Sequence, residues 1–406
     1  MKQSAYQLKL LLFCQFLATF GLMVLIPVMP LYLTKLTASN SSATLWASFA
    51  LAAPAIGSLL TAPLIGRLAD SWGHRRVLFL SLSAFGCSLL MMSYASSMMV
   101  FIAARVLLGF SGISVAITSY TMHTVSASAR GQALGKQQSA VAAACLSGPL
   151  LGGIFMDKWG MELLLNLTAA LTCITLLVAA LLLRHVPEHA VSGSRQPLPS
   201  KWYLRRDNLA WLGAGILAQA GAFSLVTCFA LYISEQQSLA LPVATTTGML
   251  HALAWTGTFL AGAYWGKRND LGKAGINFIL ASAVCGIAIG LLIWADVLWQ
   301  FALLRLLQGL CFAALIPSVM YSLCQSCPDH PGQVTGTAKS ALVLGQLAGP
   351  LAVAAIYPFW GANGALLMTA GLFIGGSLLL IINKYLALAL KPQASGSKTQ
   401  LSKVIE

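Results

Sequence analysis

Long apolar stretches without a charged side chain dominate the chain, and short polar segments separate them. No Asp, Glu, Lys or Arg occurs in residues 10–34, 36–66, 77–104, 163–183, 208–234, 236–266, 274–295, 306–328 and 340–383. A membrane-spanning helix needs about 20 mostly apolar residues, because it crosses about 30 Å of hydrocarbon at roughly 1.5 Å per residue. The last stretch is long enough for two spans. The pattern predicts a polytopic, all-α membrane protein.

Hydropathy and turn signals together predict twelve transmembrane helices. We expect them near residues 8–33, 45–66, 77–94, 98–126, 134–156, 162–184, 209–233, 244–265, 274–294, 298–325, 335–357 and 363–385. Prolines, serines and basic residues concentrate in 185–207, between the sixth and seventh spans. This segment predicts a cytoplasmic linker between two six-helix bundles, 1–184 and 208–390. The polar residues 391–406 predict a disordered cytoplasmic tail.

Composition agrees with this interpretation. The chain is 58% hydrophobic and only 8% charged, whereas soluble domains carry roughly 25% charged residues. The first apolar run lacks a small-residue cleavage site, so we interpret it as a retained helix and not as a signal peptide. Cys324 and Cys327 have the spacing of metal ligands, but no second pair completes a site, and no metal is expected.

The distribution of basic residues predicts the orientation in the membrane. The net charge is +14. With both termini in the cytoplasm, 20 of the 24 Lys and Arg fall on the cytoplasmic side, Lys339 among them. Lys35 and Lys158 fall on the opposite side, and Arg105 and Arg305 fall within spans. This asymmetry follows the positive-inside rule. The basic excess therefore indicates topology and contact with anionic lipids, and not nucleic-acid binding.

The two halves of the chain repeat each other. Four motifs recur in the same order at an offset of 200 or 201 residues: Gly66-Arg-Leu-Ala-Asp70 as Gly266-Lys-Arg-Asn-Asp270, Arg105-x-x-x-Gly109 as Arg305-x-x-x-Gly309, Gly131-Gln132-x-x-Gly135 as Gly332-Gln333-x-x-Gly336, and Gly148-Pro149 as Gly349-Pro350. Four ordered matches indicate a duplicated six-helix unit. Parallel repeats of this kind are typical of secondary transporters with a central site.

A short motif follows the second span. It reads Gly66-Arg-Leu-Ala-Asp70-Ser-Trp-Gly73-His-Arg75-Arg76. The motif resembles the GxxxDxxGRR loop of the major facilitator superfamily, with His74 in place of the first Arg. The resemblance implies a twelve-helix fold of two pseudo-symmetric bundles and a gating latch between the halves. Asp70 can accept bonds from the free N–H groups of a helix N-terminus. The alternative is a solvated loop that only sets topology.

The fifth span carries a row of small residues. It reads Gly135-x8-Ala144-x3-Gly148-Pro149-x2-Gly152-Gly153. This is similar to the antiporter motif of drug:proton exporters in the same superfamily, with Ala144 replacing one Gly. Small residues allow close helix packing, and Pro149 bends the helix. The resemblance implies efflux, and a general packing seam is the alternative.

Arginines occupy equivalent places in the fourth and tenth spans. Arg105 resembles the start of the RxxQG motif of the family, although Leu108 replaces the Gln, and the second half keeps the full form from Arg305 to Gly309. An Arg within a span costs a few kcal/mol unless it faces a cavity or a partner. We expect both to approach the pseudo-twofold axis and to bind substrate. Snorkelling to the interface is the alternative.

The predicted spans have no acid in their middle. Every Asp and Glu falls in a loop, a tail or near a span end, and a central cavity would hold Arg105, Arg305 and Lys339. Five glutamines are further substrate-binding candidates: Gln15, Gln138, Gln219, Gln308 and Gln346. For each of them a hydrogen bond between packed helices is equally plausible. A cationic lining favours anionic cargo.

Coupling to protons requires a titratable group, and three residues are candidates. His251 shares a helix face with Trp255 and belongs to the residue type that titrates near neutral pH, although a structural, hydrogen-bonded role fits it as well. Arg105 can modulate a proton site, and Glu235 is the best acidic alternative. No cofactor is expected, because the proton gradient would supply the energy.

These features predict a monomeric, proton-coupled antiporter of the bacterial inner membrane that exports a small organic solute. An anionic or amphipathic cargo is favoured, a carboxylate-type metabolite such as a siderophore above all. Residues 1–184 would rock against 208–390 around a site lined by spans one, four, seven and ten. Broad multidrug efflux is the alternative. A passive facilitator would not need the antiporter-like fifth span, and a membrane-embedded enzyme would need a catalytic constellation that the helix faces lack.

Overall fold

The computed structural model describes residues 2–25, 40–183, 201–235 and 243–389. In these ranges the chain is helical and forms no strand. The α-helices of the first half are α1 (Lys2–Met23), α3 (Asn40–Trp72), α4 (His74–Ser93), α5 (Met98–Phe110), α6 (Ile113–Thr124), α7 (Arg130–Lys158) and α8 (Met161–Leu182). Those of the second half are α9 (Arg206–Glu235), α10 (Val243–Arg268), α11 (Ala274–Leu291), α12 (Leu298–Ser326) and α13 (Pro331–Ala389). Four short turns complete the list: η1 (Ala127–Ala129), η2 (Trp202–Leu204), η3 (Asn269–Lys273) and η4 (Leu292–Trp294).

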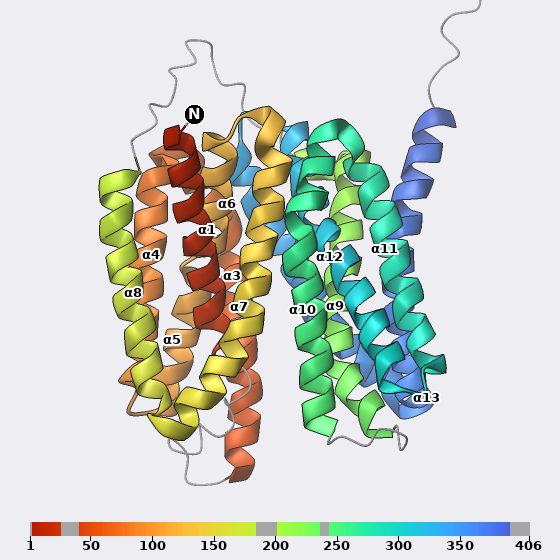
Figure 1. The fold of residues 1–406 in the computed structure, drawn as a ribbon. Coiled ribbons are helices and arrows are strands. Elements are labelled where there is room, and N and C mark those ends of the chain that lie inside the picture. The colour runs from red at the N-terminus through yellow and green to blue at the C-terminus, as the bar shows by residue number, and fades with distance from the viewer. Residues whose placement is uncertain (1, 26–39, 184–200, 236–242, 390–406) are drawn as a thin grey trace, which may run out of the picture.

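The helices form two bundles that stand side by side (Figure 1). One hydrophobic cluster joins buried residues of 11–183. A second cluster joins residues of 202–380 and includes Met122 and Leu134 of the first half. Each bundle thus has a core of its own, and a few residues pack across the boundary. Most of the predicted linker, and the whole predicted tail, lie outside the described residues. Trp202, at the end of the predicted linker, is buried in the second core.

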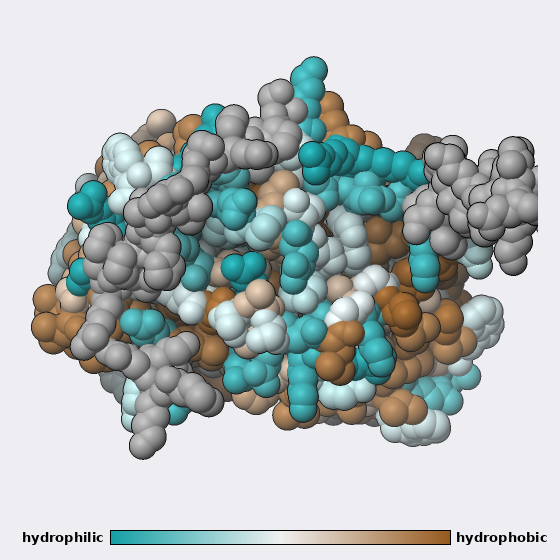
Figure 2. Space-filling view, turned by 90° about the horizontal axis from the view of Figure 1, so that it is seen from above, coloured by the Kyte–Doolittle hydropathy of each residue, from teal (hydrophilic) through white to brown (hydrophobic). Residues whose placement is uncertain are grey.

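The outward faces of the helices are apolar and exposed, as a lipid environment requires. On α8, for example, the side chains of Leu177 and Leu181 are 66% and 84% exposed. Exposed apolar surface on this scale marks contact with a membrane. Figure 2 shows hydrophilic residues over the end that carries the N-terminus and hydrophobic residues at its rim. Within the described chain, nine segments are long and apolar enough to span a bilayer.

Two of these nine segments contain a reversal of the chain. The segment Thr246–Trp294 includes Gly272 at φ +74°, and the segment Pro331–Leu386 includes Gly361 at φ +62°. A positive φ is accessible to Gly without steric cost, so the chain can turn there between two helices. The reversal at Gly361 falls in the gap predicted between the last two spans. The total of twelve spans stays a prediction.

One expectation about local structure is wrong, and one predicted span has a break inside it. The motif Gly66–Arg76 is not a loop, because α3 runs through it to Trp72 and α4 starts at His74. Only Gly73, at φ +95°, interrupts the helices. The fourth predicted span corresponds to the apolar segment Met98–Thr124, but within it α5 ends at Phe110 and α6 starts at Ile113 around Gly112 at φ +55°. Both breaks occur at a Gly in the left-handed region, where other residues are strained.

Candidate functional site

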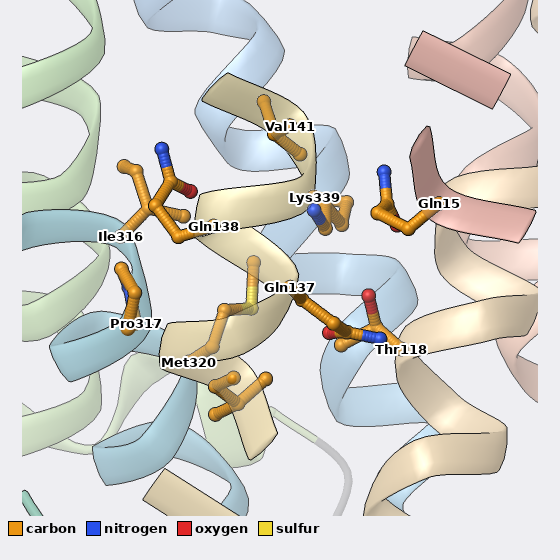
Figure 3. Close-up of a pocket in the computed structure, with 10 residues that line it drawn as sticks. Gln15, Thr118, Gln137, Gln138, Val141, Ile316, Pro317, Met320 and Lys339 are labelled. Atoms are coloured by element: carbon orange, nitrogen blue, oxygen red, sulfur yellow. The ribbon is translucent and has the colours of Figure 1, made fainter. Parts of the chain in front are cut away.

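A cavity with both polar and apolar lining lies between the two bundles and is the strongest candidate site. It encloses about 300 Å³ of space not filled by atoms, part of it open to solvent. Helices α1, α6 and α7 of the first half and α12 and α13 of the second half line it (Figure 3). The lining residues are Gln15, Thr118, Leu134, Gln137, Gln138, Val141, Ile316, Pro317, Met320 and Lys339. Three sequence-predicted residues, Gln15, Gln138 and Lys339, therefore meet here.

Lys339 is the only charged residue among those that line the cavity in the described chain. Its Nζ donates to Ser114 Oγ of α6 across the boundary between the halves, at 3.3 Å. An ammonium carries three donors, so two remain for a ligand or water. Lys339 was counted on the cytoplasmic side by its place in the sequence, but the structure puts it inside the protein, because α13 already begins at Pro331.

Glutamine side chains orient toward different neighbours around this cavity. Gln15 Nε2 donates to Thr19 Oγ1 within α1 at 3.2 Å, and Gln137 Nε2 donates to Thr121 Oγ1 of α6 at 2.9 Å. Gln138 points from α7 toward α12 (Figure 3). The cavity thus offers neutral donors and acceptors beside one cation and no carboxylate among its described lining.

Two carboxylates bridge the two halves at the end of their boundary that lies near the N-terminus. Asp70, at the end of α3, accepts from the backbone N–H of Gly332 (2.9 Å) and of Gln333 (2.7 Å) in the first turn of α13. The first N–H groups of a helix have no partner within the helix, and the helix dipole favours an anion there. This contact agrees with the predicted latch between the halves. His74 Nε2 lies 3.5 Å from Asp70 Oδ1.

The second half carries the matching latch. Asp270 accepts from the N–H of Gly131 (2.6 Å) and of Gln132 (2.8 Å), in the first turn of α7. We name these two contacts the Asp70 latch and the Asp270 latch. The sequence repeat places Asp270 at the position equivalent to Asp70, but only the structure shows that it binds a helix N-terminus of the opposite half.

Arg75 and Arg76 of the motif do not take part in the latch. Arg75 Nη2 donates to the carbonyl of Ala180 in α8 at 2.8 Å, and its guanidinium lies 5.1 Å from the ring centroid of Phe79. The Arg76 side chain is exposed. Both therefore belong to the first bundle and its surface, where they suit the headgroup region.

Glycines allow the backbones of the two halves to touch below the latches. A Cβ on Gly66 would clash with the carbonyl of Gly332, and one on Gly135 would clash with the carbonyl of Gly262. Hydroxyl bonds follow the same symmetry. Ser139 Oγ donates to the carbonyl of Phe259, and Ser340 Oγ donates to the carbonyl of Leu59, both at 2.7 Å. The boundary is closed here by backbone contact.

The small residues of α7 serve two different interfaces. Gly148 and Gly152 pack against Met23 and Val24 of the first half, whereas Gly135 faces the second half. Gly153 has nothing within 4 Å of an added Cβ. Pro149 lies inside α7. The motif is therefore not one continuous packing seam.

Arg305 is held inside the second bundle through both terminal nitrogens, while its buried Nε has no hydrogen-bond partner among the described residues, and it does not line the cavity. Its Nη1 donates to Gln308 Oε1 and its Nη2 bonds His251 Nδ1, both at 2.8 Å. The guanidinium also lies 4.7 Å from the ring centroid of Phe229. Because a guanidinium has donors only, His251 Nδ1 must be the acceptor. His251 is thus unprotonated at Nδ1 in this arrangement.

Arg105 occupies the equivalent position in the first bundle with fewer partners. Its side chain is 0% exposed, and its Nε donates to the carbonyl of Ala50 in α3 at 2.9 Å. Its Nη1 has no hydrogen-bond partner among the described residues. Neither Arg105 nor Arg305 lines the described cavity. Their expected approach to a shared central site is not seen, because each is held by its own bundle.

The remaining predicted residues lie apart from the cavity. Gln219 of α9 packs against α13, where its Cβ lies 3.0 Å from the position that a Cβ on Gly345 would take. Gln346, the next residue of α13, is half-buried. Glu235 is exposed at the end of α9 and accepts from the hydroxyl of Tyr357 at 3.2 Å. Span seven, now α9, contributes no described lining residue, contrary to expectation.

Sequence reasoning missed Ser114, Thr118 and Gln137. A hydroxyl in a membrane helix usually bonds its own backbone, so Ser and Thr give no signal by themselves. The sequence repeat offers the available signal. At its offset of 200 or 201 residues, Ser114 and Ala314 are equivalent positions, as are Gln138 and Lys339. Differences between the halves at such positions mark where the repeat has diverged.

The chain also matches known proteins. The sequence model of the Major Facilitator Superfamily matches residues 11–297 and 245–404. The chain belongs to the major facilitator superfamily. Like other members, it is a multi-pass membrane transporter and not an enzyme.

Individual proteins are also similar to the chain over most of its length. The chain is 29% identical over 382 residues to the Staphyloferrin B transporter of Staphylococcus aureus, covering 92% of this chain and 91% of that protein. It is 27% identical over 377 residues to Multidrug resistance protein MdtG of Salmonella schwarzengrund, covering 88% and 90%. The human organic anion transporter MFSD10 (TETRAN) has the same fold, with a TM-score of 0.73 at 22% identity over 92% of this chain and 98% of that one.

Proposed function

We propose that this superfamily member exports a small organic anion in exchange for protons, with a carboxylate-type metabolite such as a siderophore as the leading cargo. The observation that carries the proposal is the ammonium of Lys339, alone and without a carboxylate in the described lining of the cavity between the halves. An uncompensated buried cation is costly, and an anionic cargo is its natural counter-ion. The relative named for staphyloferrin B supports this cargo class.

The membrane potential would assist such an export. In a cell that is negative inside, moving one anionic charge outward gains about 2.3 kcal/mol per 100 mV, and a proton moving inward gains the same. Exchange of an anion for a proton therefore uses the potential twice. This gives a physical reason for antiport with an anionic cargo.

The pair His251–Arg305 is the proposed proton-coupling element. In the present arrangement His251 Nδ1 accepts from Arg305 Nη2. A proton on Nδ1 would turn this acceptor into a donor facing a cation, so the bond would break and the guanidinium would be released. The other groups around the pair are uncharged: Gln308 on α12, Phe229 on α9 and Cys285 on α11, whose thiol donates to the carbonyl of Gln308. Protonation of His251 is therefore the change of charge available there.

Closure at the two latches supplies the alternating step. The Asp70 and Asp270 latches hold the halves together at the end that carries the N-terminus, which the distribution of basic residues predicts to be cytoplasmic. Cargo would enter from the cytoplasm when both latches open. Rocking of 1–184 against 208–390 would then expose the cavity alternately to the two sides.

Broad multidrug efflux is the second candidate. The likeness to Multidrug resistance protein MdtG favours it, and so do Met320 and the neutral glutamines of the cavity, because flexible Met side chains suit varied ligands. An exporter of cationic drugs would not benefit from Lys339. The charge of the cargo therefore separates the two candidates.

Efflux from energised cells tests the proposal. Cells that carry the native protein should export a citrate-type siderophore, and Lys339→Gln should lower that export by roughly tenfold or more, since hydrogen bonds to a charged group contribute about 1.5–3 kcal/mol. Ethidium should be a poor cargo. A protonophore should abolish export against a gradient. Strong ethidium export with no siderophore movement would establish the multidrug candidate instead, and unchanged accumulation with protonophore would indicate a passive facilitator.

A further inference from the structure

The boundary between the halves is symmetric in its closure but not in its charge. The latches, the glycine contacts and the two serine hydroxyl bonds all occur in pairs related by the repeat. The cavity breaks this symmetry. Lys339 is equivalent to Gln138, and its partner Ser114 is equivalent to Ala314, which has no hydroxyl. Both residues of the Lys339–Ser114 contact thus differ from their equivalents in the other half. As a result, only one side of the pseudo-symmetric cavity carries a charge.

The walls of the cavity differ in the same sense. Figure 3 shows Gln15 and Thr118 on one side of Lys339, and Ile316 and Pro317 on the other. Helices α1, α6 and α13 thus contribute only polar residues to the described lining, whereas α12 contributes Ile316, Pro317 and Met320. Helix α7 lies between them and contributes both kinds. One wall can bind an anionic group, and the opposite wall can only pack against apolar surface.

We infer that the cargo is an amphipathic organic acid, bound with one carboxylate at Lys339 and Ser114 and with an uncharged, partly apolar body against α12. This inference rests on the proposed function and narrows its cargo. One ammonium neutralises one carboxylate, and further carboxylates of a compact polyacid would face Ile316, Pro317 and Met320 without partners. Burying an ionised carboxylate without a partner is strongly unfavourable.

Three dansyl compounds of nearly equal body test the charge preference. Dansylglycine carries a carboxylate, dansyl amide is neutral, and dansyl-ethylenediamine carries an ammonium. Binding to the full chain in lipid nanodiscs is measured by titration calorimetry, with empty nanodiscs subtracted. We expect dansylglycine to bind roughly 10- to 100-fold more tightly than dansyl amide. Citrate, a tricarboxylate without an apolar body, should compete weakly.

Variants locate the preference on one wall. Lys339→Gln should remove the preference for dansylglycine, and Lys339→Arg should keep most of it. The exchange Gln138→Lys with Lys339→Gln preserves the net charge of the cavity but moves it beside α12, so it should not restore the preference. Met320→Gln should weaken the binding of all three dansyl compounds to the same extent. Thermal unfolding of each variant in nanodiscs verifies that it is folded.

Several outcomes would overturn the inference. Equal binding of the three dansyl compounds, a carboxylate preference that survives Lys339→Gln, full restoration by the exchanged pair, or tight binding of citrate would each contradict it. The siderophore assay separates this failure from that of the proposed function. Siderophore export without dansylglycine binding would contradict only the inference of an amphipathic cargo. Absence of both would contradict the proposed anion export as well.

Discussion

At the scale of single residues, equivalent sequence positions have diverged in what they contact. Arg305 has two hydrogen-bonded side chains and an aromatic face as neighbours, whereas Arg105 bonds only the carbonyl of Ala50 among the described residues. Each keeps one buried nitrogen without a partner in the described chain, Nη1 of Arg105 and Nε of Arg305. Hydrogen bonds within its own bundle offset part of the free-energy cost of burying an Arg side chain. The arginines are therefore internal elements of each bundle, and we propose Lys339 as the charge that a cargo meets.

Replacement of His251 tests the proposed proton coupling. His251→Gln retains an acceptor that Arg305 can bond, but a Gln side chain does not take up a proton near neutral pH. We expect uphill export driven by a proton gradient to be lost, while exchange of cargo without a gradient continues. His330→Gln, a histidine outside the Arg305 cluster, is the matched control and should keep proton-driven export. Persistence of uphill export in His251→Gln would assign coupling to another group.

At the scale of helices, carboxylates of the opposite half accept hydrogen bonds at the N-termini of α7 and α13, and we propose that closure depends on them. Each latch replaces the missing intrahelical partners of a first turn with an acidic side chain from the opposite half. The latches are far apart in sequence and related by the repeat. Both must break for the halves to separate at this end.

Neutralising one latch should favour the open state. Asp70→Asn keeps an acceptor but loses the charge. We therefore expect the closed state to lose about 1 kcal/mol of stability relative to the open state, which shifts the equilibrium between them roughly fivefold. Turnover should slow while cargo affinity stays within a few-fold. Spin labels at Trp72 and Asp329, both exposed, report the opening after exposed Cys87 and Cys173 are replaced.

The Asp270 latch should respond in the same way. We expect Asp270→Asn to shift the same equilibrium in the same direction, and the double variant to shift it further. Asp296→Asn, an acid outside both latches, serves as control. A large loss of cargo binding with unchanged opening would place Asp70 in the binding site and not in a latch.

Two glycines of α7 should respond oppositely to alanine. A methyl group on Gly135 meets the carbonyl of Gly262 in the other half, whereas one on Gly153 meets nothing within 4 Å. Overpacking costs about 1–3 kcal/mol, so Gly135→Ala should disfavour the closed state by roughly 5- to 100-fold. Gly153→Ala should leave transport unchanged and raise stability slightly, because Ala favours a helix. Spin-label distances and thermal unfolding measure both.

At the scale of the whole molecule, two bundles with separate cores meet through a thin polar and glycine-rich boundary. The cores can remain intact while the boundary opens, since few buried apolar residues cross it. Rigid-body motion is then less costly than rearrangement inside a bundle. We therefore expect the boundary residues, and not the cores, to decide which state is populated.

The predicted orientation is tested at the same scale. The distribution of basic residues predicts that both termini and the linker are cytoplasmic. Cysteines introduced near Pro197 and after Pro392 should resist an impermeant thiol reagent added to intact cells, and should react after permeabilisation. A cysteine at Lys158 should react from outside. Labelling of the linker or the tail in intact cells would reverse the orientation.

The sequence by itself determined the membrane class, the location of the helices and the duplication, because each depends on local hydropathy or on spacing along the chain. The resemblance of the motif around Asp70 to the family loop also implied a latch there. The tertiary structure decided that α3 extends through the motif, that Asp270 forms a second latch, and that Lys339, not Arg105 or Arg305, faces the cavity. Such contacts join residues of different helices, and helix rotation and packing set them. Hydropathy carries little information on either.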